Sequence, residues 1–514
     1  MKFSIKKLTA LLLAAMMICC SLAAGVYADE AAPDTVGTVV TDAAEGAEEA
    51  ADVTAEASSA DLVEQLRSLD GVITVTPVEV SEENKAADRF QGRYVVVFEQ
   101  PINWDNPEEG TFPQRVLVGY SETADVTCYN TSGYCLTDKL APGALETADV
   151  RDDLKNRYDC NFVDLEYRFF GDSVPEGLSL DDTKYWEYMT SENASKDFHH
   201  IVTELNKVLG GSTIFCGGSK GGYTTESMAY YFPDDIDAYI SYVAPLCDGT
   251  ADPRLYENVS RTIGSKDPAY GEEGSAKLRD LVTSMQLMLL DTRARDMVQA
   301  MFMSQVEAAG LHISPLVTED EAYEEAVVEF GVTIWQSYPH FEEFEAIMAL
   351  PEETEEEFFN KVISIGNYFI GLSAVGNVTY DYAIAPYYIQ SYTEMGNLRT
   401  DFTYLREAGA ELRTPPENEA DLLVRLWAPL VVNNGIEYDG TYREELINFM
   451  NTTDKDIIKI VALSDPWYAV KAPETDNEHI HLYEVTGCHI TDINLMDEEA
   501  KAECWALIDS LLGK

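Results

Sequence analysis

The chain has 514 residues, of which 46% are hydrophobic and 11% aromatic, so it is long and apolar enough to bury one or two large cores. Its 91 acidic residues outnumber 35 lysines and arginines, which gives a formal net charge of -56. A surface this acidic repels phosphate backbones and anionic headgroups, which argues against nucleic-acid and membrane-surface partners. The charge modestly favours cationic ligands such as free peptide amino groups, although solubility explains it equally well.

The N-terminus has the pattern of an export signal. Three lysines in the first seven residues precede an apolar stretch from Leu8 to Gly25. Small residues then stand at the two positions that a signal peptidase inspects, which predicts cleavage before Asp29. No later segment has the apolar run of about 20 residues that a transmembrane helix needs. We therefore predict a signal peptide at 1–28 and a secreted protein without a membrane span, either free or retained at the cell surface.

The segment that follows the signal has the composition of a spacer. Residues 29–60 are rich in Ala, Glu, Asp, Thr and Ser and contain no aromatic residue. Such a segment buries too little apolar surface to offset the entropy cost of ordering. We therefore predict a disordered acidic spacer here.

From about Asp61, strand signals begin to alternate with helix signals. Short runs of β-branched and aromatic residues are separated by stretches whose apolar residues recur at helical spacing. Strands are predicted at 94–101, 114–120, 125–130, 160–170, 212–217 and 237–246, the first two antiparallel, and helices at 193–209 and 223–232. This alternation is typical of an α/β sheet.

The pattern changes at residue 248. Residues 248–452 are dominated by acidic, aromatic-rich stretches with helical spacing. Strand signals return at 456–467 and 479–487, before a final helix at 497–513. We therefore predict one α/β domain formed by residues 61–247 and 453–514, interrupted by a helical cap domain at 248–452.

A glycine-rich loop stands between a predicted strand and a predicted helix. Residues 217–221, GGSKG, fit the G-x-S-x-G pattern, which in this context indicates a nucleophile elbow centred on Ser219. A phosphate-binding P-loop requires Lys before Ser or Thr, and the order here is the reverse. A plain glycine turn remains open on the motif alone.

Partners for Ser219 are expected in the chain order serine, acid, histidine, each after a strand. Asp465 stands at the carboxyl end of the strand signal IKIVALSD. His489 follows just beyond the last predicted strand, whereas His479 and His481 lie within it and are better explained as sheet residues. We therefore predict a catalytic triad of Ser219, Asp465 and His489.

The roles in this triad follow from its chemistry. His489 would take the hydroxyl proton of Ser219 and deliver it to the leaving amine, while Asp465 would orient the imidazole and stabilise its charged form. The backbone N–H of Lys220 is the expected first donor of an oxyanion hole, and the loop at Gly133 and Tyr134 the expected source of the second. The side chain of Lys220 is expected to form a structural ion pair.

The segments around these residues resemble a known family. GGSKGG at 217–222, followed by YYFPDDIDAYISYVAP, is the most specific match. Supporting segments, in the same order, are QP (100–101), GTFPQRV (110–116), SGY (132–134), LEYRFFGDSVPE (165–176), YMTSENASKDFHHI (188–201), SDPW (464–467) and GCHITDI (487–493). The chain resembles the secreted tripeptidyl and tetrapeptidyl aminopeptidases, which are serine peptidases related to the lysosomal Pro-X carboxypeptidases. The resemblance is thin through the helical insertion.

This resemblance implies an α/β-hydrolase core with a large helical cap inserted between the sixth and seventh core strands. It also implies hydrolysis of short peptides from their free N-termini, in units of three or four residues and commonly after proline. Two positions depart from the family pattern: Asn103-Trp104 stands where the family has Asp-His, and Tyr167 where it has His.

Two features near the predicted site have alternative interpretations. Glu166, at the end of a core strand, could bind the α-ammonium of a substrate or form an ion pair with Arg168 or another cation. The tyrosine-dense segment 379–398 is expected to be mostly core of the cap, with some rings lining a pocket.

Other functions are compatible with the same residues. A carboxylic-ester hydrolase would use the same triad and oxyanion hole, and a catalytically inactive surface-binding protein could keep the fold. No residue cluster predicts a metal or an organic cofactor, and no cysteine pair has the spacing of a zinc site.

Overall fold

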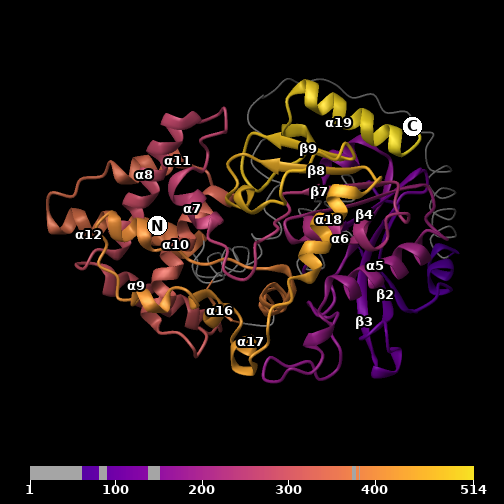
Figure 1. Ribbon diagram of the computed structural model, residues 1–514, viewed down its shortest axis with the longest axis horizontal. Helices are drawn as coiled ribbons and strands as arrows, with labels where there is room; N and C mark the ends of the chain where they lie inside the picture. The colour runs from indigo at the N-terminus through magenta and orange to yellow at the C-terminus, as the bar shows by residue number, and fades with distance from the viewer. Residues whose placement is uncertain (1–60, 80–88, 137–150, 373–377, 381–382) are drawn as a thin grey trace, which may run out of the picture.

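The computed structural model describes the chain from residue 61 onward, as Figure 1 shows. The described residues are 61–79, 89–136, 151–372, 378–380 and 383–514. The predicted signal peptide at 1–28 and spacer at 29–60 lie outside them.

The core of the molecule is a nine-stranded sheet with the strand order β1-β2-β3-β5-β4-β6-β7-β8-β9. The strands are β1 (Val72–Pro77), β2 (Gly92–Pro101), β3 (Thr111–Tyr120), β4 (Val126–Thr131), β5 (Cys160–Leu165), β6 (Ser212–Gly218), β7 (Ala238–Tyr242), β8 (Ile457–Ala462) and β9 (Ile480–Val485). The first three strands are antiparallel, and β3 is antiparallel to β5. All pairs from β5 through β4 and β6 to β9 are parallel. This mostly parallel sheet confirms the predicted α/β-hydrolase fold.

Helices cover both faces of the sheet. They are α4 (Asp152–Arg157), α5 (Ser191–Leu205), α6 (Lys220–Tyr231) and α19 (Glu498–Leu511), with short turns of helix at η1 (Pro107–Glu109), η3 (Trp186–Tyr188), η6 (Pro466–Val470) and η7 (Ile493–Leu495). Successive residues of a strand point to opposite faces, so Phe215 of β6 packs with Phe198 of α5, while Ile214 and Cys216 join the cluster that contains Ile508 of α19. Burial on both faces explains why the parallel strands are almost continuously apolar.

The described residues between β7 and β8 fold into helices. These are α7 (Arg254–Arg261), α8 (Gly271–Leu290), α9 (Arg295–Ala308), α10 (Glu319–Ser337), α11 (Phe341–Met348), α12 (Glu355–Leu372), α14 (Ala385–Gln390), the π-helix η4 (Ser391–Met395), α15 (Thr403–Glu407), η5 (Pro416–Asn418), α16 (Leu422–Trp427), α17 (Pro429–Asn434) and α18 (Thr441–Thr452). In Figure 1, α7–α12 form a body beside the sheet, whereas α18 runs along α6. The last helix of the insertion therefore packs on the core layer, through ring contacts such as that of Tyr442 with Tyr223.

The sheet differs from the prediction at β1 and at the end of β5. β1 was not predicted, and it adds a strand before the six that were, so the helices lie between β7 and β8 in the structural numbering. The strand predicted at 160–170 ends at Leu165, because the chain turns at Phe169, which has a positive φ of 67° and whose N–H donates to the carbonyl of Ser173. No helix among the described residues has both the length and the apolar character needed to cross a membrane.

Candidate active site

The chain turns sharply at Ser219, between β6 and α6. The backbone of this residue has φ 58° and ψ -124°, a conformation that a residue with a side chain adopts only under strain. Ser219 is half-buried and directly precedes the N-terminus of α6, where the helix dipole is positive. The structure thus gives Ser219 the strand–turn–helix setting of a nucleophile elbow.

Glycines allow this turn to lie against its neighbours. A Cβ atom on Gly221 would lie 1.9 Å from the carbonyl oxygen of Thr131, and one on Gly217 would lie 2.4 Å from the same oxygen. A Cβ atom on Gly222 would lie 2.6 Å from the carbonyl oxygen of Tyr242. These neighbours are backbone atoms, which cannot rotate away as the end of a side chain can. The loop can therefore approach β4 and β7 only because it carries no side chain at these positions.

The structure brings Asp465 and His489 together. Asp465 follows β8 and is 1% exposed, and its Oδ1 accepts a hydrogen bond of 3.0 Å from the N–H of Trp467. Its Oδ2 lies 2.7 Å from Nδ1 of His489, which follows β9. A carboxylate oxygen accepts, so Nδ1–H of His489 donates to Asp465, and in the neutral imidazole Nε2 then carries the lone pair.

The imidazole Nε2 of His489 is buried and makes no hydrogen bond to any described residue. Its lone pair is therefore available to accept a proton. A hydrogen bond from the Ser219 hydroxyl is not formed in this structure, and such bonds commonly tighten only when substrate binds.

Helix α10, in the helical region, bonds to the backbone of His489. The backbone carbonyl of Gln336 accepts a hydrogen bond of 3.1 Å from the N–H of His489. The side-chain Oε1 of the same residue accepts one of 2.9 Å from Nε1 of Trp467. Gln336 thus holds both loops, a role that the sequence does not reveal because a single glutamine near the end of a helix carries no signal of its own.

The expected oxyanion loop lies against Lys220. Gly133 has a positive φ of 81°, and a Cβ atom on it would lie 2.7 Å from Cγ of Lys220. However, the Gly133 N–H donates to Oγ1 of Thr131 at 3.0 Å, and the Tyr134 N–H donates to Oγ of Ser132 at 3.3 Å. The structure thus places the loop at Gly133 and Tyr134 beside Lys220. The N–H groups of both loop residues form hydrogen bonds within the loop itself.

The side chain of Lys220 is 1% exposed and lies among aromatic rings. Its Nζ is 3.1 Å from the ring centroid of Tyr167, and the rings of Phe170 and Tyr134 are 5.5 and 5.8 Å away. The contact with the ring of Tyr167 is a cation–π contact. Tyr167, one of the two departures from the family pattern, supplies the closest ring.

Glu166 is buried in a structural ion pair. Arg115 donates to it from Nε at 2.7 Å and from Nη2 at 2.6 Å. The carboxylate also accepts from the N–H of Leu136 at 2.7 Å and from the hydroxyl of Ser173. Both oxygens are occupied, so the geometry favours the ion-pair alternative over ammonium binding, with Arg115 as the cation in place of Arg168.

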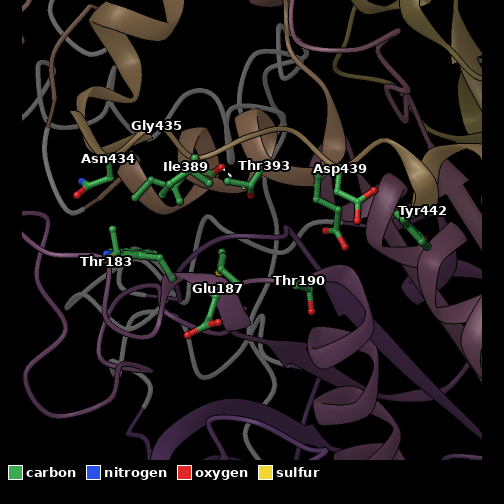
Figure 2. A pocket seen from close by; sticks show the side chains of 13 residues that line it. Thr183, Glu187, Thr190, Ile389, Thr393, Asn434, Gly435, Asp439 and Tyr442 are labelled. Atoms are coloured by element: carbon green, nitrogen blue, oxygen red, sulfur yellow. Dashed lines mark hydrogen bonds between the residues drawn. The ribbon is translucent and has the colours of Figure 1, made fainter. Parts of the chain in front are cut away.

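A cavity of about 670 Å³ opens between the core and the helical region. Figure 2 shows Thr183 and Glu187 on one side, facing Ile389 and Thr393 on the other. Three carboxylates line it, those of Glu187, Glu394 and Asp439. An acidic cavity of this size suits a cationic group on a small ligand.

Glu394 connects this cavity to the elbow. Its carboxylate accepts hydrogen bonds of 2.8 Å from both the N–H and the hydroxyl of Ser191, and one of 3.2 Å from Nε2 of Gln390. The same Nε2 lies 3.0 Å from the hydroxyl of Tyr167, whose ring covers Lys220. Burial raises the pKa of the Glu394 carboxyl, and the donors from Ser191 offset part of this effect.

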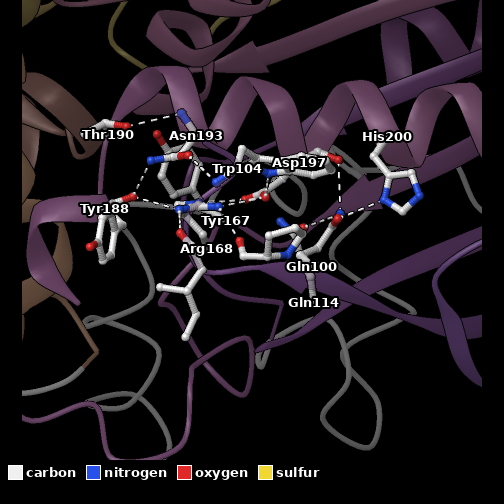
Figure 3. A network of polar contacts seen from close by, with 12 residues as sticks. Gln100, Trp104, Gln114, Tyr167, Arg168, Tyr188, Thr190, Asn193, Asp197 and His200 are labelled. Atoms are coloured by element: carbon white, nitrogen blue, oxygen red, sulfur yellow. Dashed lines mark hydrogen bonds and ion pairs between the residues drawn. The ribbon is translucent and has the colours of Figure 1, made fainter. Parts of the chain in front are cut away.

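A network of polar contacts holds together the segments around Trp104, Arg168 and Asp197. Figure 3 shows Arg168 facing Asp197; the guanidinium donates to the carboxylate from Nε at 2.7 Å and from Nη2 at 2.8 Å. Trp104, the second departure from the family pattern, donates to the same carboxylate at 2.7 Å. Both departures are therefore accommodated by contacts within the protein.

A second buried acidic pair lies in the helical region. Glu325 and Glu329 are one turn apart on α10, and the hydroxyl of Tyr256 lies within hydrogen-bond distance of both carboxyl groups. Burial raises the pKa of each carboxyl, and the charge of Glu329 raises that of Glu325 further.

The chain matches known protein families in sequence. A family model described as PS-10 peptidase S37 matches residues 55–419, a range that includes Ser219 and ends before Asp465 and His489. A prolyl tri/tetrapeptidyl aminopeptidase of Streptomyces mobaraensis is 25% identical over 467 residues, covering 89% of this chain and 87% of the relative. The lysosomal Pro-X carboxypeptidase of Mus musculus is 30% identical over 103 residues, covering 19% of this chain and 20% of that protein.

Two solved structures illustrate the structural matches. Proline iminopeptidase of Mycobacterium smegmatis is 11% identical, with a TM-score of 0.30, covering 81% of this chain and 98% of that structure. The 2-hydroxy-6-oxo-6-phenylhexa-2,4-dienoate hydrolase of Rhodococcus is 11% identical, with a TM-score of 0.32, covering 82% and 99%.

Proposed function

Because the chain belongs to the PS-10 peptidase S37 family, we propose that this serine peptidase releases short peptides from free N-termini through an acyl-enzyme on Ser219. The observation that carries the proposal is the 2.7 Å hydrogen bond between Asp465 and His489, formed at the ends of adjacent parallel strands. It supplies an oriented base on the same edge of the sheet as the strained serine turn.

In the proposed reaction, Nε2 of His489 accepts the hydroxyl proton as Oγ of Ser219 attacks the peptide carbonyl carbon. Asp465 holds the proton on Nδ1 and stabilises the imidazolium. When the C–N bond breaks, the imidazolium gives its proton to the departing amine and leaves an acyl-enzyme. Water, deprotonated by the same imidazole, then hydrolyses the ester and restores Ser219.

The negative charge on the tetrahedral oxygen needs two donors. The backbone N–H of Lys220 is the first, at the positive end of α6. For the second we propose the loop at Gly133 and Tyr134, of which the Tyr134 N–H has the longer and weaker bond, 3.3 Å to Ser132. A substrate oxyanion is a stronger acceptor than a serine hydroxyl and would draw this donor away.

The acidic cavity supports recognition of a free amino group. A peptide with a free N-terminus carries an ammonium charge, and Glu394 offers a half-buried carboxylate that accepts hydrogen bonds from the uncharged donors Ser191 and Gln390. An ammonium ion there would form charge-assisted hydrogen bonds in place of solvent. The name of the Streptomyces relative agrees with release of tri- and tetrapeptides after proline.

We propose that the helical region acts as a cap that restricts access to peptide ends. Its α10 bonds to the His489 loop through Gln336, and the ring of Tyr387 lies 5.7 Å from that of Tyr134 in the proposed oxyanion loop. Export, by the signal predicted at 1–28, would place the enzyme among extracellular peptides.

Labelling with a fluorophosphonate probe tests the nucleophile. The native protein should be labelled, and Ser219→Ala or the unfolded protein should not. Ser227→Ala is the matched control, because it removes a buried hydroxyl of the same helix that bonds to the carbonyl of Tyr223. Failure of the native protein to label, or equal labelling of Ser219→Ala, would refute the assignment. Equal cleavage of free and N-acetylated peptides would refute the N-terminal specificity alone.

A further inference from the structure

Asp267 joins the two loops that carry the proposed acid and base. This residue lies between α7 and α8 and is 0% exposed. Its Oδ2 accepts a hydrogen bond of 2.7 Å from the hydroxyl of Ser464 and one of 3.0 Å from the N–H of Gly487. One oxygen atom of the helical region therefore bridges the loop after β8 and the loop after β9.

The two donors stand next to the reacting residues in the chain. Ser464 directly precedes Asp465, and Gly487 stands two residues before His489. The loops also bond to each other, since the N–H of Ser464 donates to the carbonyl of Gly487 at 2.9 Å. Together with the two bonds to Asp267, this bond makes three hydrogen bonds among Asp267, Ser464 and Gly487. These bonds restrain the distance between the two loops.

The carboxylate of Asp267 is itself held in one orientation. Its Oδ1 accepts from the N–H of Ala269 at 2.9 Å, and its backbone carbonyl accepts from Gly271 at 2.8 Å. Hydrogen bonds therefore hold both the carboxylate and the backbone of Asp267. Because this acceptor is held in place, the positions of both loops depend on the position of the helical region.

We propose that Asp267 is a positioning residue for the Asp465–His489 pair. It touches neither the imidazole nor the reacting serine, and acts by holding the two loops at the spacing that the 2.7 Å bond requires. The inference rests on the proposed catalytic roles of that pair. It adds that the helical region sets the geometry of the acid and base, in addition to restricting access.

The expected effect is on the rate of the chemical step. Misplacement of a reacting group by about 1 Å can cost about a hundredfold in rate. Loss of a partner that orients a site residue commonly costs about ten- to a hundredfold in the analogous case of metal ligands. We expect Asp267→Asn to lower kcat within this range, about ten- to a hundredfold, and to change KM by less than about twofold.

The experiment compares kcat for two variants and one control. Asp267→Asn weakens both bonds, and Ser464→Ala removes only one of them while leaving the Gly487 bond. Ser464→Ala should therefore lose kcat by a smaller factor, about three- to tenfold. The control is Ser314→Ala, which removes a buried hydroxyl of the helical region that donates to the carbonyl of Arg425, remote in sequence from both loops.

Rates are to be expressed per site titrated with a fluorophosphonate, so that loss of folded protein does not lower kcat. The inference stands if kcat per titrated site falls in the order Ser314→Ala, Ser464→Ala, Asp267→Asn, with KM unchanged. It is overturned if the variants only reduce the number of titrated sites or the melting temperature. Should Asp267→Asn fail to fold, Ser464→Ala against Ser314→Ala still decides. A native protein that is not labelled would instead refute the proposed function.

Discussion

The glycine at position 221 provides a sharp test of the elbow. In Gly221→Ala, the new Cβ atom would start 1.9 Å from the carbonyl oxygen of Thr131, whereas real Cβ atoms essentially never come within 3.0 Å of a heavy atom. Thr131 is the last residue of β4, so neither partner can rotate away, and α6 and β4 must separate by about 1 Å. Overpacking of this kind costs about 1–3 kcal/mol of stability.

The same displacement acts on the reaction, because it moves the Lys220 N–H relative to the loop that follows Thr131. A shift of about 1 Å can cost about a hundredfold in rate, so we expect kcat/KM to fall by about two orders of magnitude.

The assay compares kcat/KM, the rate of fluorophosphonate labelling and the melting temperature of this variant with those of Gly274→Ala. Gly274 lies in α8, and a Cβ atom there would meet only the Cβ of Tyr270, at 3.8 Å. Alanine at such a helical position should stabilise the protein by up to about 1 kcal/mol and leave the rates unchanged. If Gly221→Ala labels and turns over like the native enzyme, the close approach that defines the elbow does not exist.

Two further predictions concern acidic residues of the helical region. Glu394→Gln should raise KM about tenfold or more for peptides with a free N-terminus, because a charge-assisted bond is lost. Hydrolysis of short-chain esters should be unchanged. If the variant and the native enzyme have equal KM values in Michaelis–Menten measurements, Glu394 does not bind the ammonium group. Burial raises the pKa of Glu325 and Glu329 above the ordinary value of 4.5, so the folded state holds protons that the unfolded chain has released. Stability should therefore fall as the pH rises above about 4.5, until the raised pKa values are passed. Glu329→Gln should reduce this fall, measured as melting temperature between about pH 5 and 9, whereas the exposed control Glu353→Gln should not; identical profiles would contradict the assignment.

The parts of the molecule that could be predicted are those with local signals. The parallel strands are apolar runs because both faces are buried, and the elbow is visible as glycines around Ser219 between a strand and a helix. The prediction that Asp465 and His489 lie together also needed only local information, since the carboxyl ends of neighbouring parallel strands meet at one edge of a sheet.

The parts that could not be predicted depend on contacts between distant segments. Gln336, on α10, and Asp267, in the turn between α7 and α8, reach the two loops through packing that leaves no pattern in their own sequence. Glu166 has the same acidic side chain whether it binds a substrate or Arg115, and only the fold decides which cation is adjacent. β1 has six residues, of which only Val75 is buried, so it lacks the alternation between a buried and an exposed face that marks a strand.

The strand order also has a consequence for biosynthesis. β8 and β9 follow the whole helical region in the chain, although they complete the sheet beside β7. As the polypeptide emerges, β7 is an open edge, and open edges invite pairing with other chains. The strands that close this edge are also those that bring Asp465 and His489. Cover of the β7 edge and the proposed ability to cut peptides therefore both await the synthesis of β8 and β9, and an incomplete chain that already contains Ser219 lacks both.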